Sequence, residues 1–206
     1  MSYPPEPWRL RGSLHLTLWR IPEGDLPATP VRTPPLLVGG SGFVGTAWVV
    51  YGPGSVLEYE ELLAAVLVRD RRSPRAHISH IWVNSAPSQR GGRELWGIPK
   101  ERAEFQVRSD TGDTRTARAA GFGAAGIAAA GFARTARLPG SAPFAFRIAQ
   151  DLNGFQQTGV RGASPVSWCA SDWRFDPDGP LGWLGGRRPV ASLAMAGFDM
   201  NFGTAR

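Results

Sequence analysis

Residues 91–104 hold the side chain of this sequence that is best suited to covalent chemistry. The segment reads GGRELWGIPKERAE and contains Lys100, the only lysine among 23 basic residues. Arginine stays protonated at any relevant pH, whereas a buried lysine can lose its proton and become a nucleophile. Lys100 follows Pro99 and the compact run at 96–98. We therefore expect its amine to lie in a shaped, partly apolar pocket.

Histidine and cysteine offer little material for other chemistry. His77 and His80 lie three apart, so a regular strand would place them on opposite faces, and His15 is the only further histidine. Cys169 is alone, so it has no intramolecular partner, which fits a reducing compartment. We therefore predict no metal site and no other cofactor.

The composition indicates a folded, strand-rich chain. Its 206 residues are enough for one domain, spanning 1–206, with a sizeable core, and only 19% of them are charged. The 26 glycines and 18 prolines punctuate the sequence at short intervals. This spacing favours many short strands over long helices.

The formal net charge of +6 would suit an anionic partner. The arginines are nevertheless spread along the chain, with one dense patch at Arg69, Arg71, Arg72 and Arg75, so we do not expect nucleic-acid binding. A solvated loop is the simplest interpretation of this patch. Docking of an acidic carrier protein and steering of an anionic substrate are the functional alternatives.

The chain shows no sign of membrane targeting. No apolar run has membrane-spanning length, and the start MSYPPEPW lacks the basic and apolar regions of a signal peptide. We expect a cytoplasmic protein without membrane contact.

Hydrophobic patterning predicts strands along most of the chain, at 14–18, 46–51, 62–68, 77–83, 105–108, 144–148, 166–175 and 190–202. Residues 62–68 form a continuous apolar run, which indicates a buried strand, with a short helix as the alternative. The small residues at 117–133 are also assigned to strands, packed tightly against a neighbour. We assign 21–35, 151–165 and 176–189 to loops, 93–96 to a helical turn and 109–113 to a hairpin turn.

Gly40, Gly42 and Gly45 match the pattern G-x-G-x-x-G of dinucleotide-binding folds. That function needs a helix directly after the glycines, so that its N-terminus faces the pyrophosphate. The residues that follow, TAWVVYG, are aromatic and β-branched and predict a strand instead. A dinucleotide site is therefore a minor alternative.

The segment GGRELWGIPKE resembles the lysine motif of the acetoacetate decarboxylase superfamily, which is close to G-R-E-x-x-G-x-P-K. Weaker similarity follows in the same order at 11–19, at YEELL (59–63) and in the C-terminal strand that ends at Phe202. The resemblance implies a mostly β (α+β) fold, a cone-shaped antiparallel β-barrel with few short helices and an internal pocket. It also implies a homo-oligomer and a Schiff base between Lys100 and a keto acid.

The same resemblance implies the other site residues. Glu61 best matches a family carboxylate and would be the acid–base group. Glu94 is expected to support the lysine turn through an ion pair or a helix-end contact. The residues expected to bind the substrate are Arg11, Tyr59, Arg93 and Trp96.

A neutral amine near pH 7 requires the lysine pKa to fall to about 7, a bias of about 4 kcal/mol against the charged form. Burial alone can supply this. Acetoacetate decarboxylase is itself the standard example of a lysine activated by an apolar pocket or a cationic neighbour. Glu101 stands where that enzyme has a second lysine. We expect Glu101 to point away from Lys100, and Arg93 or Arg102 to give any cationic help.

One departure leaves the reaction open. Family decarboxylases carry a further carboxylate on the strand before Glu61, whereas residues 44–51 contain no acid. The motif is thus compatible with decarboxylation of a β-keto acid, a carbon–carbon lyase reaction. It is also compatible with aldolase, dehydratase or cyclase chemistry of secondary metabolism, for example on pyruvate. A non-catalytic barrel that binds a small apolar ligand is the remaining alternative.

Overall fold

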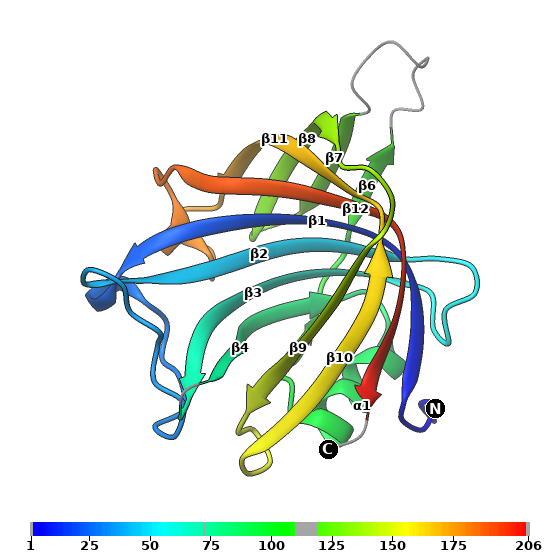
Figure 1. Ribbon diagram of the computed structural model, residues 1–206, viewed down its shortest axis with the longest axis horizontal. Helices are drawn as coiled ribbons and strands as arrows, with labels where there is room; N and C mark the ends of the chain where they lie inside the picture. Colours follow the sequence, from blue (N-terminus) through cyan, green and yellow to red (C-terminus); the bar gives the residue numbers. More distant parts are fainter. Residues whose placement is uncertain (1, 72, 110–118, 205–206) are drawn as a thin grey trace.

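The computed structural model describes residues 2–71, 73–109 and 119–204 and consists mainly of strands (Figure 1). These ranges contain one α-helix and two short 3-10 helices. The elements are β1 (Trp8–Pro22), η1 (Glu23–Asp25), β2 (Ser41–Tyr51), β3 (Tyr59–Asp70), β4 (Ser73–Val83), α1 (Ala86–Trp96), β5 (Lys100–Arg102), β6 (Gln106–Ser109), β7 (Ala119–Ala124), β8 (Ala128–Arg137), β9 (Ala142–Gln150), β10 (Gln156–Ser164), β11 (Val166–Phe175), η2 (Gly182–Leu184) and β12 (Pro189–Thr204).

Seven of these strands close into a barrel. They pair in the order β1-β2-β3-β4-β9-β10-β12, and β12 pairs back with β1 from Trp8 to Trp19. The ring is antiparallel except between β4 and β9, which run parallel where Ala76 meets Ile148. The short strand β5 also lies parallel to β4. The predicted mostly β barrel is confirmed, with these two parallel pairings as the difference.

The remaining strands extend from the barrel and cover one side of it. β12 pairs with β11 as well, and β8, β7 and β6 follow in that order. Phe132 of this second sheet packs in one cluster with Trp19, Trp48 and Leu62, which project from the outer faces of β1, β2 and β3. These three barrel strands are therefore buried on both faces.

Alternation along β3 separates two cores. The even-numbered residues 62–68 belong to the cluster between the barrel and the second sheet. The odd-numbered residues 59–67 line the barrel interior. Successive side chains of a strand point to opposite faces, so one strand serves both cores. This explains the unbroken apolar run at 62–68 and confirms the buried strand over the alternative helix.

The helix α1 lies at the end of the barrel where both chain termini are found (Figure 1). Its buried residues are Ser88, Gly91, Gly92 and Trp96. No helix in the described part of the chain is long and apolar enough to cross a membrane.

Strand β10 corrects the assignment of residues 151–165 to a loop. Its glycines suggested a turn, but they permit close packing of strands. A Cβ on Gly162 would lie 2.5 Å from the carbonyl oxygen of Asp199 on β12 and 2.8 Å from the ring of Phe144 on β9. Glycine is therefore needed inside this strand because both of its neighbours approach closely.

The other glycine-rich segments behave as predicted where they are described. Residues 119–124 and 128–137 are strands built largely from small side chains. Gly42 and Gly45 lie within β2, and a strand rather than a helix follows them, so the geometry of a dinucleotide site is not formed. The predicted turn at 109–113 falls mostly outside the described residues.

We predict that Leu62→Ala lowers the free energy of unfolding by about 2–5 kcal/mol, because it opens a cavity between the barrel and the second sheet. Leu62 has no exposed surface. The matched control is Leu138→Ala, because Leu138 is 40% exposed and its loss should cost less than about 0.5 kcal/mol. Urea denaturation of both variants tests this. Equal effects would contradict a shared core.

Candidate active site

The chain reverses direction at the end of α1, and this places the Lys100 side chain against the buried face of the helix. Ser85 caps the helix N-terminus by accepting a hydrogen bond from the Ser88 N–H (3.3 Å). At the other end Gly97 adopts a left-handed conformation (φ 60°), and its N–H bonds back to the carbonyl of Arg93. Pro99 cannot continue the helix, and the chain leaves as β5.

The paired glycines of the motif make room on the buried face of α1. A Cβ on Gly92 would lie 2.7 Å from Cδ of Lys100, and a Cβ on Gly91 would lie 2.6 Å from the Trp8 ring. Real Cβ atoms do not approach other atoms this closely. Gly92 therefore lets the Lys100 side chain lie directly against the helix backbone. Gly91 lets the ring of Trp8 on β1 lie against the same backbone.

The amine of Lys100 has three hydrogen-bond partners, two on β3 and one on α1. Its Nζ donates to Oε2 of Glu61 on β3 (2.8 Å), to Oγ of Ser88 on α1 (3.0 Å) and to the hydroxyl of Tyr59 on β3 (3.3 Å). An ammonium group has three N–H donors, so this set satisfies it completely. Lys100 and Glu61 are each only 4% exposed, so they form a buried ion pair.

Glu61 is held from its other side as well. The hydroxyl of Tyr51 on β2 donates to its Oε1 (3.1 Å), while Oε2 faces the lysine. Glu61 points into the barrel because it is an inward residue of β3. The carboxylate is thus fixed by β2, β3 and β5 together.

Two opposing effects act on the pKa of Lys100. Complete burial lowers it, whereas the charge of Glu61, the hydroxyl of Tyr59 and the hydrogen bonds to both raise it, and the balance lies above the ordinary 10.5. The predicted low pKa of Lys100 is therefore wrong, because the prediction counted burial and not the charge of Glu61 beside the amine. Burial also raises the pKa of Tyr59 and Tyr51, so both hydroxyls stay protonated near neutral pH.

The predicted substrate-binding residues separate into two groups. Tyr59 and Trp96 line the barrel cavity beside Lys100. Arg11 instead pairs with Asp199 (2.8 Å) on the exposed surface, and Arg93 donates to the backbone carbonyl of Lys100 (3.0 Å). Neither arginine lines the cavity, so their predicted direct contact with substrate is corrected. Arg93 therefore supports the lysine turn by binding the backbone carbonyl of Lys100, and it does not contact the Lys100 amine.

The acidic neighbours of Lys100 in the sequence do not reach the amine. Glu101 is exposed and accepts a hydrogen bond from Nε1 of Trp82 (3.2 Å), so it points away from Lys100 as expected. Glu94 accepts a hydrogen bond from the hydroxyl of Tyr3 (2.6 Å). It therefore ties α1 to the residues before β1, and its support of the lysine turn stays a prediction.

Sequence reasoning did not identify Ser88 or Tyr51 as site residues. Ser88 lies four residues before Gly92, which places both on one helical face, and this spacing was the available signal. Tyr51 lies opposite Tyr59 in the pairing of β2 with β3. No local motif marks it, because its position depends on the register of two strands.

The cavity around Lys100 has a volume of about 530 Å³ and occupies the barrel interior. Lys100 and Glu61 are the only charged side chains among the described residues that line it. Most of the others are aliphatic or aromatic, and they come from all seven barrel strands. A carbonyl compound that enters this cavity would meet one amine and one carboxylate in largely apolar surroundings.

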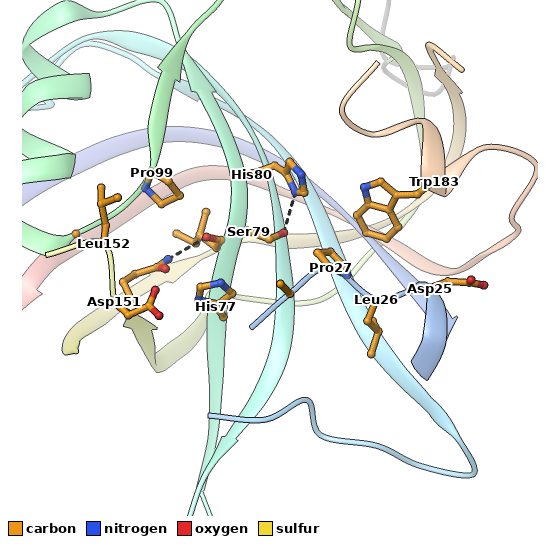
Figure 2. Close-up of a pocket in the computed structure, with 14 residues that line it drawn as sticks. Asp25, Leu26, Pro27, His77, Ser79, His80, Pro99, Asp151, Leu152 and Trp183 are labelled. Carbon is orange, nitrogen blue, oxygen red and sulfur yellow. Dashed lines mark hydrogen bonds between the residues drawn. The ribbon is translucent and has the colours of Figure 1, made fainter. Parts of the chain in front are cut away.

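A separate cavity lies on the outer side of β4 and contains His77 and His80 (Figure 2). In the pairing with β3, His80 faces Ala64 and Ile78 faces Ala65, which leaves Ser79 as an extra residue in a β-bulge. The bulge brings both histidines to one face, so the expectation that they lie on opposite faces is wrong. Within the described residues no group of three or more potential metal ligands occurs.

Comparisons with known proteins identify a family and a shared fold. A family model described as acetoacetate decarboxylase matches residues 33–143. No curated protein matches the sequence significantly.

Solved structures of low sequence identity share the fold. Acetoacetate decarboxylase from Legionella pneumophila has a TM-score of 0.69 and 14% identity, covering 98% of this chain and 86% of that chain. The enduracididine biosynthesis enzyme MppR complexed with pyruvate has a TM-score of 0.68 and 17% identity, with coverage of 98% and 90%. An acetoacetate decarboxylase-like enzyme from Sphingomonas wittichii RW1 has a TM-score of 0.63 and 12% identity, with coverage of 95% and 89%.

We predict that Glu61→Gln lowers the pKa of Lys100 below its ordinary value, because burial remains and the carboxylate is gone. Lysine-selective isotope labelling gives a single side-chain NMR signal, since the chain has one lysine. In the wild-type protein its titration midpoint should lie above 10.5. A raised folded-state pKa means that protonated Lys100 stabilises the fold below pH 10.5, and that this contribution is lost as the pH rises through the folded value.

The matched control for this titration is Glu58→Gln, because Glu58 is an exposed glutamate three residues before Glu61. It should leave the midpoint unchanged. A midpoint that is the same in wild type and Glu61→Gln, both folded by circular dichroism, would show that the buried pair does not form in solution.

Proposed function

Because the chain belongs to the acetoacetate decarboxylase family, we propose that it is a lysine enzyme that forms a Schiff base with a keto acid. Lys100 is the nucleophile and Glu61 the acid–base group in this proposal. The observation that carries it is the buried amine of Lys100, held 2.8 Å from a single carboxylate in an apolar cavity. We propose decarboxylation of a β-keto acid as the reaction.

The first step is the loss of a proton from Lys100. All three of its N–H groups are engaged, so the nitrogen has a lone pair only after one proton leaves. Oε2 of Glu61 is the nearest acceptor. Transfer to it converts an ion pair into a neutral amine and a carboxylic acid, and the apolar lining of the cavity lowers the cost of this step because both charges disappear.

The neutral amine then attacks the ketone carbon. A C–N bond forms, and the carbonyl electron pair moves to oxygen, which takes a proton that leaves the nitrogen. Glu61 donates its proton to the resulting hydroxyl group, which departs as water and leaves a protonated imine beside the Glu61 carboxylate. Tyr59 lies within reach of the amine, and its hydroxyl stays protonated, so it can donate a hydrogen bond to the developing oxygen.

Carbon dioxide leaves from the β-keto acid imine. The C–C bond to the carboxylate breaks, and its electron pair moves through the neighbouring carbon into the C=N bond, giving an enamine. The Glu61 carboxylate first takes up one proton from solvent and passes it to the enamine carbon, which restores the protonated imine. Water then adds to the imine carbon, the C–N bond breaks, and the ketone and protonated Lys100 are released. Overall the reaction consumes one proton for each molecule of carbon dioxide.

Condensation of an α-keto acid is a second candidate, and the cavity volume favours it. A space of about 530 Å³ exceeds the volume of a small keto acid, so a second reactant fits beside the enamine. The enamine carbon would then attack an aldehyde in place of taking a proton. MppR has been captured with the condensation product of pyruvate and imidazole 4-carboxaldehyde, which illustrates such a reaction on this fold.

We predict that borohydride reduction in the presence of acetoacetate, pyruvate or a longer keto acid attaches the ligand to the peptide that contains Lys100. Intact and peptide mass spectrometry would detect the adduct, and the keto acid that labels most completely names the substrate class. The N-terminal amine is the only competing primary amine, because the chain has one lysine. Lys100→Arg should abolish the adduct and all turnover.

The non-catalytic barrel makes the opposite prediction. It would give no adduct with any keto acid, and Lys100→Arg would leave the affinity for an apolar ligand nearly unchanged. A folded wild-type protein that traps none of these acids would overturn the proposed function.

A further inference from the structure

The barrel interior consists of stacked rows of side chains that begin at the lysine. The pairings of β1, β2 and β3 define three of them: Glu61 with Val49 and Leu14, then Leu63 with Ala47 and Leu16, then Ala65 with Gly45 and Leu18. Successive rows are two residues apart on each of the three strands. At about 3.4 Å per residue, the third row is about 14 Å from the first.

Polarity is confined to the first of these rows and the layer beside it. The charges of Lys100 and Glu61 face each other there, and the hydroxyls of Tyr51 and Tyr59 bond to them. The second and third rows present only aliphatic side chains and Gly45 to the cavity. A ligand group in these rows therefore meets neither a charge nor a side-chain hydrogen-bond partner.

Exposure increases along the same direction. Tyr59 and Glu61 are buried, whereas Leu63, Ala65 and Leu67 on the same face of β3 are half-buried. Phe146, which lines the cavity from β9, is 49% exposed. Along β3 the cavity is thus closed at Glu61 and more exposed toward Leu67, and no described residue covers the exposed part of its apolar wall.

Small residues keep the cavity wide at the second and third rows, and we call this part of the cavity the apolar passage. Gly45, Ala47 and Ala65 sit in the second and third rows, where larger side chains would fill the interior. An apolar ligand that contacts this wall is stabilised in proportion to the apolar surface, of ligand and wall together, that the contact buries.

We propose that the substrate is a keto acid whose ketone carries an extended apolar substituent. Its carbonyl lies at Lys100, and its apolar body follows the three rows toward Leu67. This inference rests on the proposed function for the carbonyl end only, because the apolar passage is independent of imine formation. Since each C–C bond of about 1.5 Å advances an extended chain by slightly more than 1 Å, the passage holds about ten carbons.

A homologous series of straight-chain methyl ketones, from butan-2-one to tetradecan-2-one, tests the length of the passage. Each ketone would be incubated with the wild-type protein and trapped on Lys100 with cyanoborohydride. The half-saturating concentration should fall about fourfold per added methylene and level off near ten carbons. Trapping that is independent of chain length, or best with butan-2-one, would overturn the proposal.

Ala65→Phe places a bulky ring in the third row, distant from Lys100. It should make the gain level off at a shorter chain than in the wild type, because the ring closes the interior between the second and third rows. The matched control is Ala145→Phe on the exposed outer side of β9, which should retain the wild-type dependence. The wild-type series decides the matter by itself if Ala65→Phe does not fold.

Primary alcohols of the same lengths separate this proposal from the imine chemistry. They cannot form an imine, but they should displace an apolar fluorescent dye from the cavity with the same dependence on chain length. Displacement by long alcohols without any ketone adduct would support the apolar passage and refute the Schiff base. Ketone adducts that ignore chain length, with no displacement by alcohols, would support the Schiff base and refute the passage.

Discussion

The structure depends on the placement of two opposite charges, Lys100 and Glu61, out of contact with water. Removing one partner of a buried ion pair typically costs about 3–5 kcal/mol, because the other charge is left without compensation. The amine reaches its partner only when α1, β3 and β5 are all in place. The left-handed Gly97, the bare surface of Gly92 and the bond from Arg93 to the Lys100 carbonyl all serve this placement. The ion pair therefore exists only in the folded barrel.

The same pair explains how a protonated lysine can still serve a reaction that needs a neutral amine. Burial lowers the pKa of Lys100, and the charge of Glu61 raises it. Held together in an apolar cavity, the two groups can exchange one proton without any change in net charge. In the proposed mechanism the neutral amine is therefore reached by a transfer over a hydrogen bond of 2.8 Å and does not require a permanently low pKa.

The sequence was sufficient for features that depend on local pattern. It predicted the buried run at 62–68, the strand after Gly45 and the burial of Lys100, because periodicity and turn residues report on each of them. It did not reveal β10, the β-bulge at Ser79 or the contact of Tyr51 with Glu61. These features depend on which strands become neighbours and in what register. Arg11 and Arg93 were misplaced for the same reason, since their partners lie far away in the chain or on its backbone.

The alternation of β1, β2 and β3 between two cores has a consequence for how such a barrel diversifies. Outward residues hold the second sheet in place, and inward residues shape the container, yet both sets share the same backbone. A substitution at an inward position beyond Glu61 exchanges a half-buried side chain and leaves the fully buried cluster on the other face intact. On β3, side chains that shape the container thus alternate one by one with side chains that hold the second sheet. The width of the container and the attachment of the second sheet are set by different residues of the same strand.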